Sequence, residues 1–343
     1  MVTFQVVRLM ILSGLSFLTA LALTPLIIGL VKKYQFGKQI RTHLLGIHQN
    51  KAGTPTMGGI IIWLTAIGLA FMFFILNFLF DGFWNYFDFI DRAQTYLPLA
   101  ALIIAALIGL ADDIFGALKI GPNGGGLKVR HKLIIYTFIA ALGAWWFYFK
   151  LGWTTIYLPF FGYYEIGFWY FPLFMFVIIA TAFSANETDG LDGLLGGVSL
   201  FSFGALTAVA FTLGRYDLAA FSSVIIGALL AFLWHNIYPA RFFMGDTGSM
   251  ALGITLGVMA MLTNTALFLP FFAFILIIES LSVIIQVISF KLTGRRVFLM
   301  SPIHHHFELL GWPETRITMR FWIISAVMSG LGIILFFLSR FIL

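Results

Sequence analysis

The stretch WYFPLFMFVIIATAFSANETDGLDGLLGGVSLFSFGALTAVAFTL, residues 169–213, decides the fold of this chain. Two apolar runs, Trp169–Ser184 and Leu195–Leu213, flank a polar centre, Ala185–Leu194, which holds three carboxylates and one side-chain amide. Each run approaches the length of about 20 apolar residues that a helix needs to cross a bilayer. A carboxylate in or beside a bilayer is costly, so the polar centre is either a short solvated loop between two spans or a functional site.

The composition of the whole chain points to the same environment. Of the 343 residues, 61% are hydrophobic and 10% are charged, whereas a soluble globular protein has about 25% charged residues. Long apolar runs recur from end to end, without the alternating segments of a membrane-spanning barrel. We therefore predict an all-α polytopic membrane protein that forms a single transmembrane domain over residues 1–343. The absence of cysteine excludes disulfides and thiolate-bound metals.

The apolar runs predict about ten transmembrane helices. Each run is close to the required length, although the third and the eighth are short. With approximate ends, the predicted spans are Met10–Val31, Gly58–Phe80, Leu97–Ala111, Leu133–Phe149, Trp169–Ala185, Gly193–Leu213, Leu218–Tyr238, Ser249–Leu262, Thr265–Phe290 and Phe321–Leu343.

Lysine and arginine residues set the predicted orientation. Fifteen of these 20 residues lie in the loops that follow odd-numbered spans, and five lie on the other side. Because cytoplasmic loops are enriched in lysine and arginine, the odd-numbered loops are cytoplasmic and both termini face the periplasm. Two aromatic-rich outer segments, Phe83–Phe89 and Tyr157–Tyr164, suit the headgroup region. We expect an interfacial helix in the first and a hairpin around Gly162 in the second.

The polar clusters of interest all fall on the predicted cytoplasmic side. The first, Lys51–Gly59, joins a lysine to glycines that let a backbone approach a phosphate closely, although an ordinary entry turn has the same composition. The second, Asp112-Asp113, ends the third span and is followed by basic residues up to Lys132. An acidic pair followed by basic residues suits a metal–phosphate site, and interfacial charge is the alternative.

The third cluster is the polar centre quoted above. On a continuous helix, Asn186, Asp189 and Gly193 share one stripe, and Asp192 lies on the adjoining face. If the sixth span begins here, its N-terminus favours these carboxylates. An anionic ligand would then need a cation between itself and the carboxylates.

The fourth cluster, Trp234–Ser249, lies between the seventh and eighth spans. Its Phe243 can stack on a nucleobase, since every base has a π-face, and interfacial anchoring is the alternative. Its Asp246 is a candidate metal ligand, and a helix cap is an equally open alternative.

The fifth cluster is the run His304-His305-His306 in the longest cytoplasmic loop. Three consecutive histidines cannot all reach one metal ion from a helix or a strand, so a closed zinc site is disfavoured. We expect a hydrogen-bonding, phosphate-facing role, with one or two of the rings pointing inward.

The placement of the acidic residues separates two classes of function. Eight of the 14 acidic residues lie on the predicted cytoplasmic side, six of those at the edges of spans, and only Glu279 lies in mid-span. An ion pathway needs charges near the midplane, whereas an active site at the membrane surface needs them at the edges. The pattern favours Mg²⁺-assisted phosphoryl chemistry over a cation transporter.

The five clusters together resemble the motifs of the phospho-N-acetylmuramoyl-pentapeptide-transferase family, a branch of the polyprenyl-phosphate N-acetylhexosamine-1-phosphate transferases. The Thr-Pro-Thr-Met-Gly-Gly and His-His-His elements are the most specific, and relatives that use UDP-N-acetylglucosamine are the alternative. The matching elements run in family order over nearly the whole chain, as Lys51–Gly59, Asp112-Asp113, Asn186–Leu194, Phe243–Ser249 and Ser301–Glu308.

The resemblance implies a fold, a reaction and a set of partners. The family has ten transmembrane helices, often as a homodimer, in the lipid bilayer of the bacterial inner membrane, with the active site on the cytoplasmic face. The implied reaction transfers phospho-MurNAc-pentapeptide from UDP-MurNAc-pentapeptide to undecaprenyl phosphate. It gives lipid I and UMP, needs Mg²⁺ and involves no nucleic acid.

The resemblance also implies residue roles, by motif position. Asp246 is the Mg²⁺ ligand, and Asp112, with Asp113 beside it, is the base or orienter for the lipid phosphate. Glu187 is a departure, because the family usually has an apolar residue there. The implied catalytic residues are Asp112, Asp113, Asp189, His304 and His305. The implied substrate-binding residues are Lys51, Lys132, Asn186, Asp192, Asn236, Phe243 and His306, with Asn236 and Phe243 holding uracil.

Overall fold

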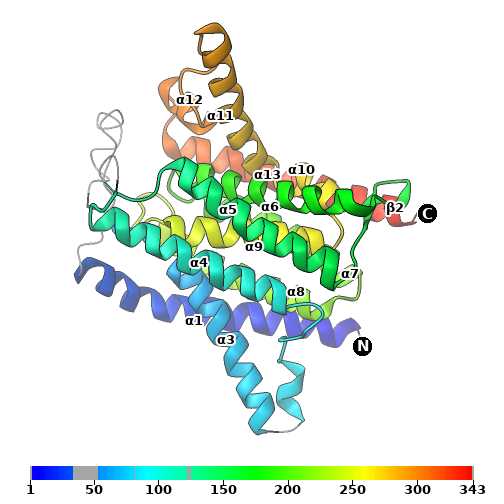
Figure 1. The fold of residues 1–343 in the computed structure, drawn as a ribbon. Helices are drawn as coiled ribbons and strands as arrows, with labels where there is room; N and C mark the ends of the chain where they lie inside the picture. Colours follow the sequence, from blue (N-terminus) through cyan, green and yellow to red (C-terminus); the bar gives the residue numbers. More distant parts are fainter. Residues whose placement is uncertain (1, 34–52, 81, 122–124, 342–343) are drawn as a thin grey trace. The chain divides into compact units, whose positions relative to one another are not determined.

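The computed structural model describes residues 2–33, 53–80, 82–121 and 125–341 (Figure 1). Within these ranges nine helices are long and apolar enough to cross a membrane. A further apolar helix, α9 (Asp246–Leu262), is shorter. The prediction of an all-α polytopic membrane protein with about ten spans is therefore confirmed. The predicted phosphate contact Lys51 lies outside the described residues.

The chain divides into two compact units, each built from two stretches of sequence. Unit 1 comprises Met1–Lys132 and Arg215–Leu252, and unit 2 comprises Leu133–Gly214 and Gly253–Leu343. Two helices, α5 (Val129–Trp145) and α9, continue from one unit into the other. A single domain over the whole chain stays a prediction.

Unit 1 is organised around α8 (Tyr216–Asn236), most of which is buried. Two long helices, α1 (Val2–Lys33) and α3 (Ile60–Leu79), pack against α8, and α4 (Tyr96–Ala117) packs against α3. The hydroxyl of Ser16 on α1 donates to the carbonyl oxygen of an α8 residue at 2.6 Å, which indicates close contact between these helices. Burial on all sides explains why α8 is apolar all round.

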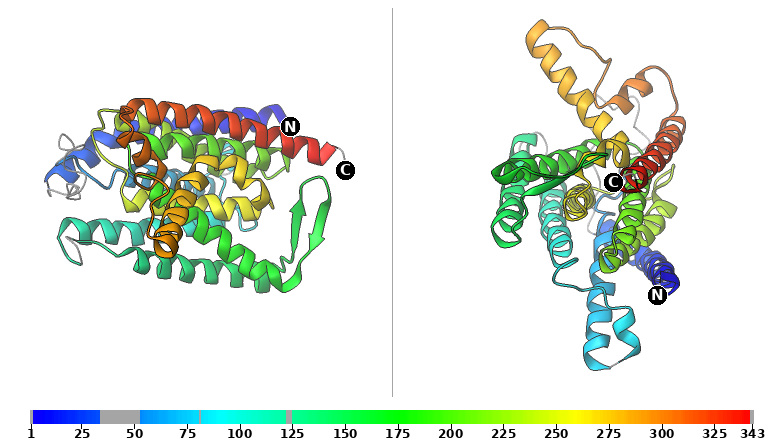
Figure 2. Two further views of the ribbon diagram at one scale, coloured as in Figure 1. Left: turned by 90° about the horizontal axis from the view of Figure 1, so that it is seen from above. Right: turned by 90° about the vertical axis from the view of Figure 1, so that its right-hand side faces the viewer.

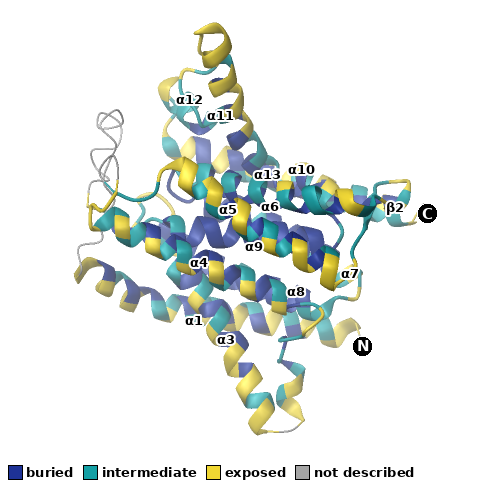
Figure 3. Cartoon of the chain, viewed as in Figure 1, coloured by how far each residue is buried: buried dark blue, intermediate teal, exposed yellow. Residues whose placement is uncertain are grey.

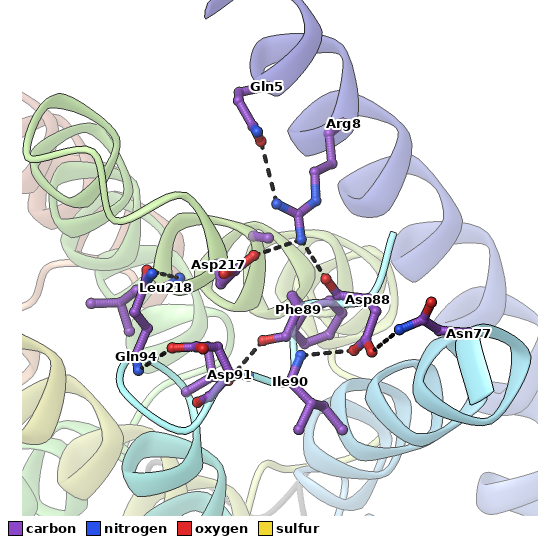
Figure 4. A network of polar contacts seen from close by, with 12 residues as sticks. Gln5, Arg8, Asn77, Asp88, Phe89, Ile90, Asp91, Gln94, Asp217 and Leu218 are labelled. Carbon is purple, nitrogen blue, oxygen red and sulfur yellow. Dashed lines mark hydrogen bonds and ion pairs between the residues drawn. The ribbon is translucent and has the colours of Figure 1, made fainter. Parts of the chain in front are cut away.

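A buried arginine ties the start of α1 to the start of α8 (Figure 4). Arg8 is 4% exposed, and its Nη2 donates to Oδ1 of Asp217 and to the carbonyl oxygen of Asp88, each at 2.7 Å. The carboxylate of Asp88 accepts a hydrogen bond from Nδ2 of Asn77 at 2.9 Å. Asp88 follows η3 (Phe83–Tyr86), a short 3₁₀ helix within the segment where an interfacial helix was expected. A buried charge needs a partner, so this network holds the starts of α1 and α8 together.

Unit 2 contains two long helix pairs. The first pair is α7 (Leu194–Thr212) on α13 (Glu314–Phe341), and the second is α6 (Tyr170–Thr188) on α11 (Phe274–Thr293). The short elements are the π-helical turn η5 (Trp146–Lys150), β1 (Thr155–Leu158), β2 (Gly162–Glu165), η6 (Gly167–Trp169), η7 (Ala266–Phe268), α10 (Leu269–Phe272) and α12 (Ile303–Leu309).

The expected hairpin around Gly162 is present. Strands β1 and β2 pair antiparallel, with Leu158 opposite Gly162. The hydroxyl of Tyr157 donates to the carbonyl oxygen of Ser339 at 2.9 Å, and the guanidinium of Arg340 lies 4.4 Å from the centre of the Tyr157 ring. These contacts hold the hairpin beside the C-terminal end of α13 (Figure 2).

The predicted spans differ from the observed helices mainly at their ends, since α1 and α13 begin earlier than predicted, and two other differences concern the third and the ninth spans. The third, Leu97–Ala111, was too short, because α4 continues through Asp112-Asp113. The ninth, Thr265–Phe290, is broken at Ala273, whose φ of −119° and ψ of 33° are not helical. Pro270 lies in the first turn of α10, where its ring is tolerated, and it disfavours a helix that continues through the residues before it, which accounts for the separate start of α10. After the break, α11 is largely exposed, as a lipid-facing helix would be (Figure 3).

Candidate active site

The carboxylate of Asp113 caps the N-terminus of α9. Its Oδ1 accepts the N–H of Asp246 and its Oδ2 accepts the N–H of Thr247, each at 3.0 Å. The first amides of a helix have no partner within the helix, and a negative charge is favourable beside them. Because Asp113 belongs to α4, the cap joins two helices and fixes the backbone of Asp246.

A lysine lies between two of the predicted site carboxylates. The Nζ of Lys132 is 2.6 Å from Oδ2 of Asp246 and 3.1 Å from Oδ2 of Asp112. The side chain of Asp112 is 2% exposed and that of Asp246 is 22% exposed. The second oxygen of Asp112, Oδ1, accepts the N–H of Leu127 at 2.5 Å. Unit 1 therefore brings Asp112, Asp113, Lys132 and Asp246 into one cluster.

The donor atoms of this cluster suit a hard divalent cation. Mg²⁺ commonly takes one or two carboxylates, while waters and substrate phosphates complete its six positions. Asp112 and Asp246 direct oxygens at one shared positive charge, which here is the ammonium of Lys132. Among the described residues, no group of three or more acidic, histidine or cysteine side chains is placed to hold a metal. A divalent cation held by Asp112 and Asp246 would take waters or substrate phosphates in its remaining positions.

The glycine-rich segment Pro55–Gly59 runs beside the residues that precede Asp246. The N–H of Phe243 donates to the carbonyl oxygen of Pro55 at 2.8 Å, and the N–H of Gly58 donates to that of Phe243 at 2.7 Å. A Cβ at Gly58 would collide with the ring of Phe242. In this structure the glycines of the segment let one part of the chain approach another, and their approach to a phosphate stays a prediction.

Asn236 and Phe243, the predicted uracil contacts, differ in accessibility. Asn236 ends α8 and is buried, and its Nδ2 donates to the carbonyl oxygen of Phe242 at 2.8 Å. Phe243 is half-buried. Of the two, Phe243 is the better placed to stack on a base.

In unit 2 the polar centre is a turn between two helices. The first helix, α6, ends at Thr188, and α7 begins at Leu194 after Gly193, whose φ is +74°. The expected helical stripe of Asn186, Asp189 and Gly193 is therefore wrong, because the backbone leaves helical geometry at Asp189, whose ψ is 58°, before it reaches Gly193. The acids of the turn precede α7, as expected for the N-terminus of the sixth span.

The turn is fixed to the beginning of α13. The N–H of Asp192 donates to Oε1 of Glu314 at 2.6 Å, and Oγ1 of Thr318 donates to the carbonyl oxygen of Asp192 at 3.2 Å. The indole N–H of Trp322 donates to the carbonyl oxygen of Gly193 at 3.1 Å. Sequence reasoning gave Glu314 no role. The available signal was a carboxylate at the start of an apolar helix.

The three histidines of α12 have different surroundings. His304 is buried, and its Nδ1 is hydrogen-bonded to Oε2 of Glu279 at 2.9 Å. The Nδ1 of His305 is 2.6 Å from Oε2 of Glu308, and the Nδ1 of His306 accepts a backbone N–H at 3.2 Å. The expectation that one or two rings point inward is confirmed for His304.

Sequence reasoning gave Glu279 no role in the site. It is fully buried in α11 and is the hydrogen-bonding partner of His304. Burial alone lowers the pKa of His304, but the carboxylate of Glu279 and its hydrogen bond, with the charges of Glu308 and Glu187, raise that pKa above its ordinary value. The missed signal was position, because an ionisable residue within a membrane span is by default a functional candidate whose partner should be sought.

The apolar helices, the Asp112–Lys132–Asp246 cluster of unit 1 and the histidines of unit 2 are the features of a polytopic membrane transferase. The model of glycosyl transferase family 4 matches residues 95–264, a range that contains Asp112, Lys132 and Asp246. Residues 51–62 match signature 1 of phospho-N-acetylmuramoyl-pentapeptide-transferase.

Relatives over nearly the full length of the chain carry the same name. A phospho-N-acetylmuramoyl-pentapeptide-transferase of Geobacillus thermodenitrificans is 39% identical over 95% of this chain and 97% of its own length. Those of Desulforamulus reducens and Bacillus anthracis are 40% and 38% identical, over 94% and 95% of this chain and 94% and 97% of their own lengths. This chain belongs to the phospho-N-acetylmuramoyl-pentapeptide-transferase family.

Proposed function

We propose that this protein transfers phospho-MurNAc-pentapeptide from UDP-MurNAc-pentapeptide to undecaprenyl phosphate in the bacterial inner membrane. The products are lipid I and UMP, in the synthesis of peptidoglycan. The observation that carries the proposal is the Asp112–Lys132–Asp246 cluster, in a chain that also carries the family signature over residues 51–62. The distribution of lysine and arginine supports an active site on the cytoplasmic face and two periplasmic termini.

Asp246 would hold Mg²⁺, with Asp112 beside it, and the ammonium of Lys132 would turn to the substrate. When bound, Mg²⁺ neutralises charge on the diphosphate and on the departing phosphate. The distances from Lys132 to both carboxylates support this assignment, because they mark where a positive charge is already held.

Asp112 would orient the acceptor. Its Oδ1 is held by the N–H of Leu127, which leaves Oδ2 to accept a proton or a hydrogen bond from undecaprenyl phosphate. An oxygen of the lipid phosphate then attacks the sugar-side phosphorus of the UDP-sugar in line. The bond from that phosphorus to the UMP oxygen breaks, and UMP leaves.

Asp113 would act through Asp246 and not on the substrate. Both of its oxygens accept backbone N–H groups at the start of α9, so its charge serves to fix that backbone. The two backbone hydrogen bonds support a role for Asp113 as a positioning residue for the metal ligand, and the direct catalytic role that the family resemblance implied stays a prediction.

The remaining predicted residues would bind the nucleotide sugar. Phe243 would stack on uracil while Asn236 holds the segment that carries it. The turn between α6 and α7 would place the diphosphate through Asp189 and Asp192. The other proposed contacts with phosphate or sugar are Lys51, Asn186, His304, His305 and His306.

One assay tests the reaction and its alternatives. Purified protein is given undecaprenyl phosphate with UDP-MurNAc-pentapeptide or UDP-N-acetylglucosamine, and UMP release is measured with and without Mg²⁺. We expect Mg²⁺-dependent release from the first sugar only. Release from UDP-N-acetylglucosamine alone would assign the chain to the sister transferases, and no release from either would contradict an enzymatic function.

Two further points of the proposal have their own measurements. A phosphoenzyme trapped on an aspartate would replace the one-step attack with a two-step path. We also propose a homodimer, as the family resemblance implies. The mass of the detergent-solubilised protein by light scattering, corrected for detergent, tests it, and a monomer mass would contradict it.

A further inference from the structure

The Glu279–His304 pair contains two polar atoms that take no part in the hydrogen bond between the two side chains. The side chains of Glu279 and His304 are 0% and 1% exposed, and they meet at 2.9 Å through Oε2 and Nδ1. The other oxygen of Glu279, Oε1, and the other nitrogen of His304, Nε2, are buried without a hydrogen-bond partner among the described residues. An unsatisfied buried polar atom is costly and calls for a functional explanation.

The Nε2 of His304 lies against the turn that carries Asp189 and Asp192. A Cβ at Gly190 would collide with Nε2, so the backbone of the turn rests directly on the imidazole edge. Only glycine permits this approach. On the opposite edge, Nδ1 is held by Glu279. The ring is thus clamped between a buried carboxylate and the turn.

We propose that Glu279 is a positioning residue for the transfer reaction. By holding Nδ1 of His304, it directs Nε2 against Gly190 and so sets the turn that places Asp189 and Asp192 for the diphosphate of the nucleotide sugar. The inference rests on the proposed function, since it takes the turn to be the diphosphate site. Glu279 acts through His304 and touches no substrate itself.

The charge of His304 belongs to the same arrangement. Carboxylates face it from three elements, with Glu279 on α11, Glu308 on α12 and Glu187 on α6, and the ring of His305 lies 4.1 Å away, centroid to centroid. Burial opposes protonation, but the carboxylates outweigh burial and raise the pKa of His304. When protonated, the ring presents an N–H and a positive charge to a turn that carries two carboxylates, and Glu187 is one of the carboxylates that favour this form.

The pH dependence of UMP release tests the inference. Glu279→Gln keeps the shape of the side chain and an oxygen that accepts from Nδ1, but removes the charge. The pKa of His304 then falls, so the alkaline limb of the kcat/KM profile moves to lower pH. Loss of a partner of a metal-bound imidazole typically costs about 10- to 100-fold, and we expect a loss within that range on the alkaline side, where the variant has lost the proton of His304 and the wild type has not.

Two further variants make the test specific. Glu279→Asp keeps the charge, so its alkaline limb should stay near that of the wild type even if its rate is lower. Glu165→Gln makes the same chemical change at an exposed position on β2, and it should alter neither rate nor limb. Gel filtration in detergent checks that each variant is folded.

Several results would overturn the inference. If the Glu279→Gln enzyme is slower but the alkaline limb of its kcat/KM profile has not moved, the carboxylate of Glu279 has a purely structural role. If that variant does not fold, a displaced limb in Glu279→Asp would contradict the proposed role of charge. Failure of the wild type to release UMP would instead contradict the proposed function, so the two failures are distinguishable.

Discussion

The carboxylate of Asp113 accepts the backbone N–H of Asp246 at 3.0 Å, so the second residue of the acidic pair positions the predicted metal ligand through its main chain. Its other oxygen holds the next amide, that of Thr247. The two adjacent acids therefore have different roles. Asp112 faces the shared positive charge of Lys132, and Asp113 caps the helix that carries Asp246.

Asp113→Ala should reduce both stability and turnover. Loss of a helix cap costs about 1 kcal/mol, and a displaced Asp246 should lower UMP release by about 100-fold, as a misplacement of about 1 Å can. The control is Asp91→Ala, because Asp91 also accepts two backbone N–H groups, at 2.8 and 2.9 Å, away from the cluster. The unfolding temperature should fall in both variants, whereas turnover should fall only in Asp113→Ala. Equal turnover in the two would contradict the positioning role.

Lys132→Met should make turnover much slower and Mg²⁺ binding tighter. The variant loses a phosphate contact, and removal of one such charge-stabilising donor costs about 10²- to 10³-fold in kcat. It also leaves Asp112 and Asp246 without the ammonium that competes with a metal ion. UMP release and the Mg²⁺ concentration for half-maximal thermal stabilisation measure the two effects. Lys128→Met, at an exposed site, should match the wild type in both.

Asp246→Asn should abolish Mg²⁺-dependent UMP release while leaving the fold intact. The amide keeps the size of the side chain and the backbone cap by Asp113, but it is a weak ligand for a hard cation. The measurement is a Mg²⁺ titration of UMP release and of the unfolding temperature. Normal turnover at the usual Mg²⁺ concentration would show that the metal assignment is wrong.

Arg8→Met should destabilise unit 1 without affecting the site chemistry. The variant leaves Asp217 and the carbonyl oxygen of Asp88 without their shared donor. Unsatisfied buried groups cost about 1–3 kcal/mol each, with the lower end expected here because the Asp217 side chain is 27% exposed. The unfolding temperature should drop, and turnover per folded molecule should not. A selective loss of turnover would contradict a purely structural network.

His304 should make stability depend on pH. The folded protein raises its pKa above the ordinary value, so the folded state binds the proton more tightly than the unfolded state. The resulting stabilisation is complete below the ordinary histidine pKa of about 6.5 and is lost as pH rises through the raised pKa. Unfolding temperatures measured from about pH 6 upward should decline more steeply for the wild type than for His304→Gln. Parallel curves would contradict this coupling.

The sequence by itself determined the membrane class, most of the span positions and the family. Hydropathy is a property of a local window, because each span must satisfy its backbone internally and bury its apolar side chains, whatever its neighbours are. The Lys51–Gly59 motif and the run of three histidines are equally local, because each consists of consecutive residues. For that reason the signature at residues 51–62 could be read before any contact was known.

Tertiary structure alone decided which partner each polar residue has. Asp113 and Asp246 are far apart in the sequence, as are Glu279 and His304, and no local pattern specifies which of several carboxylates will cap a helix or hold an imidazole. The same holds for the stripe predicted from Asn186 to Gly193, which failed because the backbone leaves helical geometry at Asp189 and becomes helical again only after Gly193. Pairing depends on how helices pack, since hydrogen bonds act over about 3 Å and the chain must first bring their atoms together.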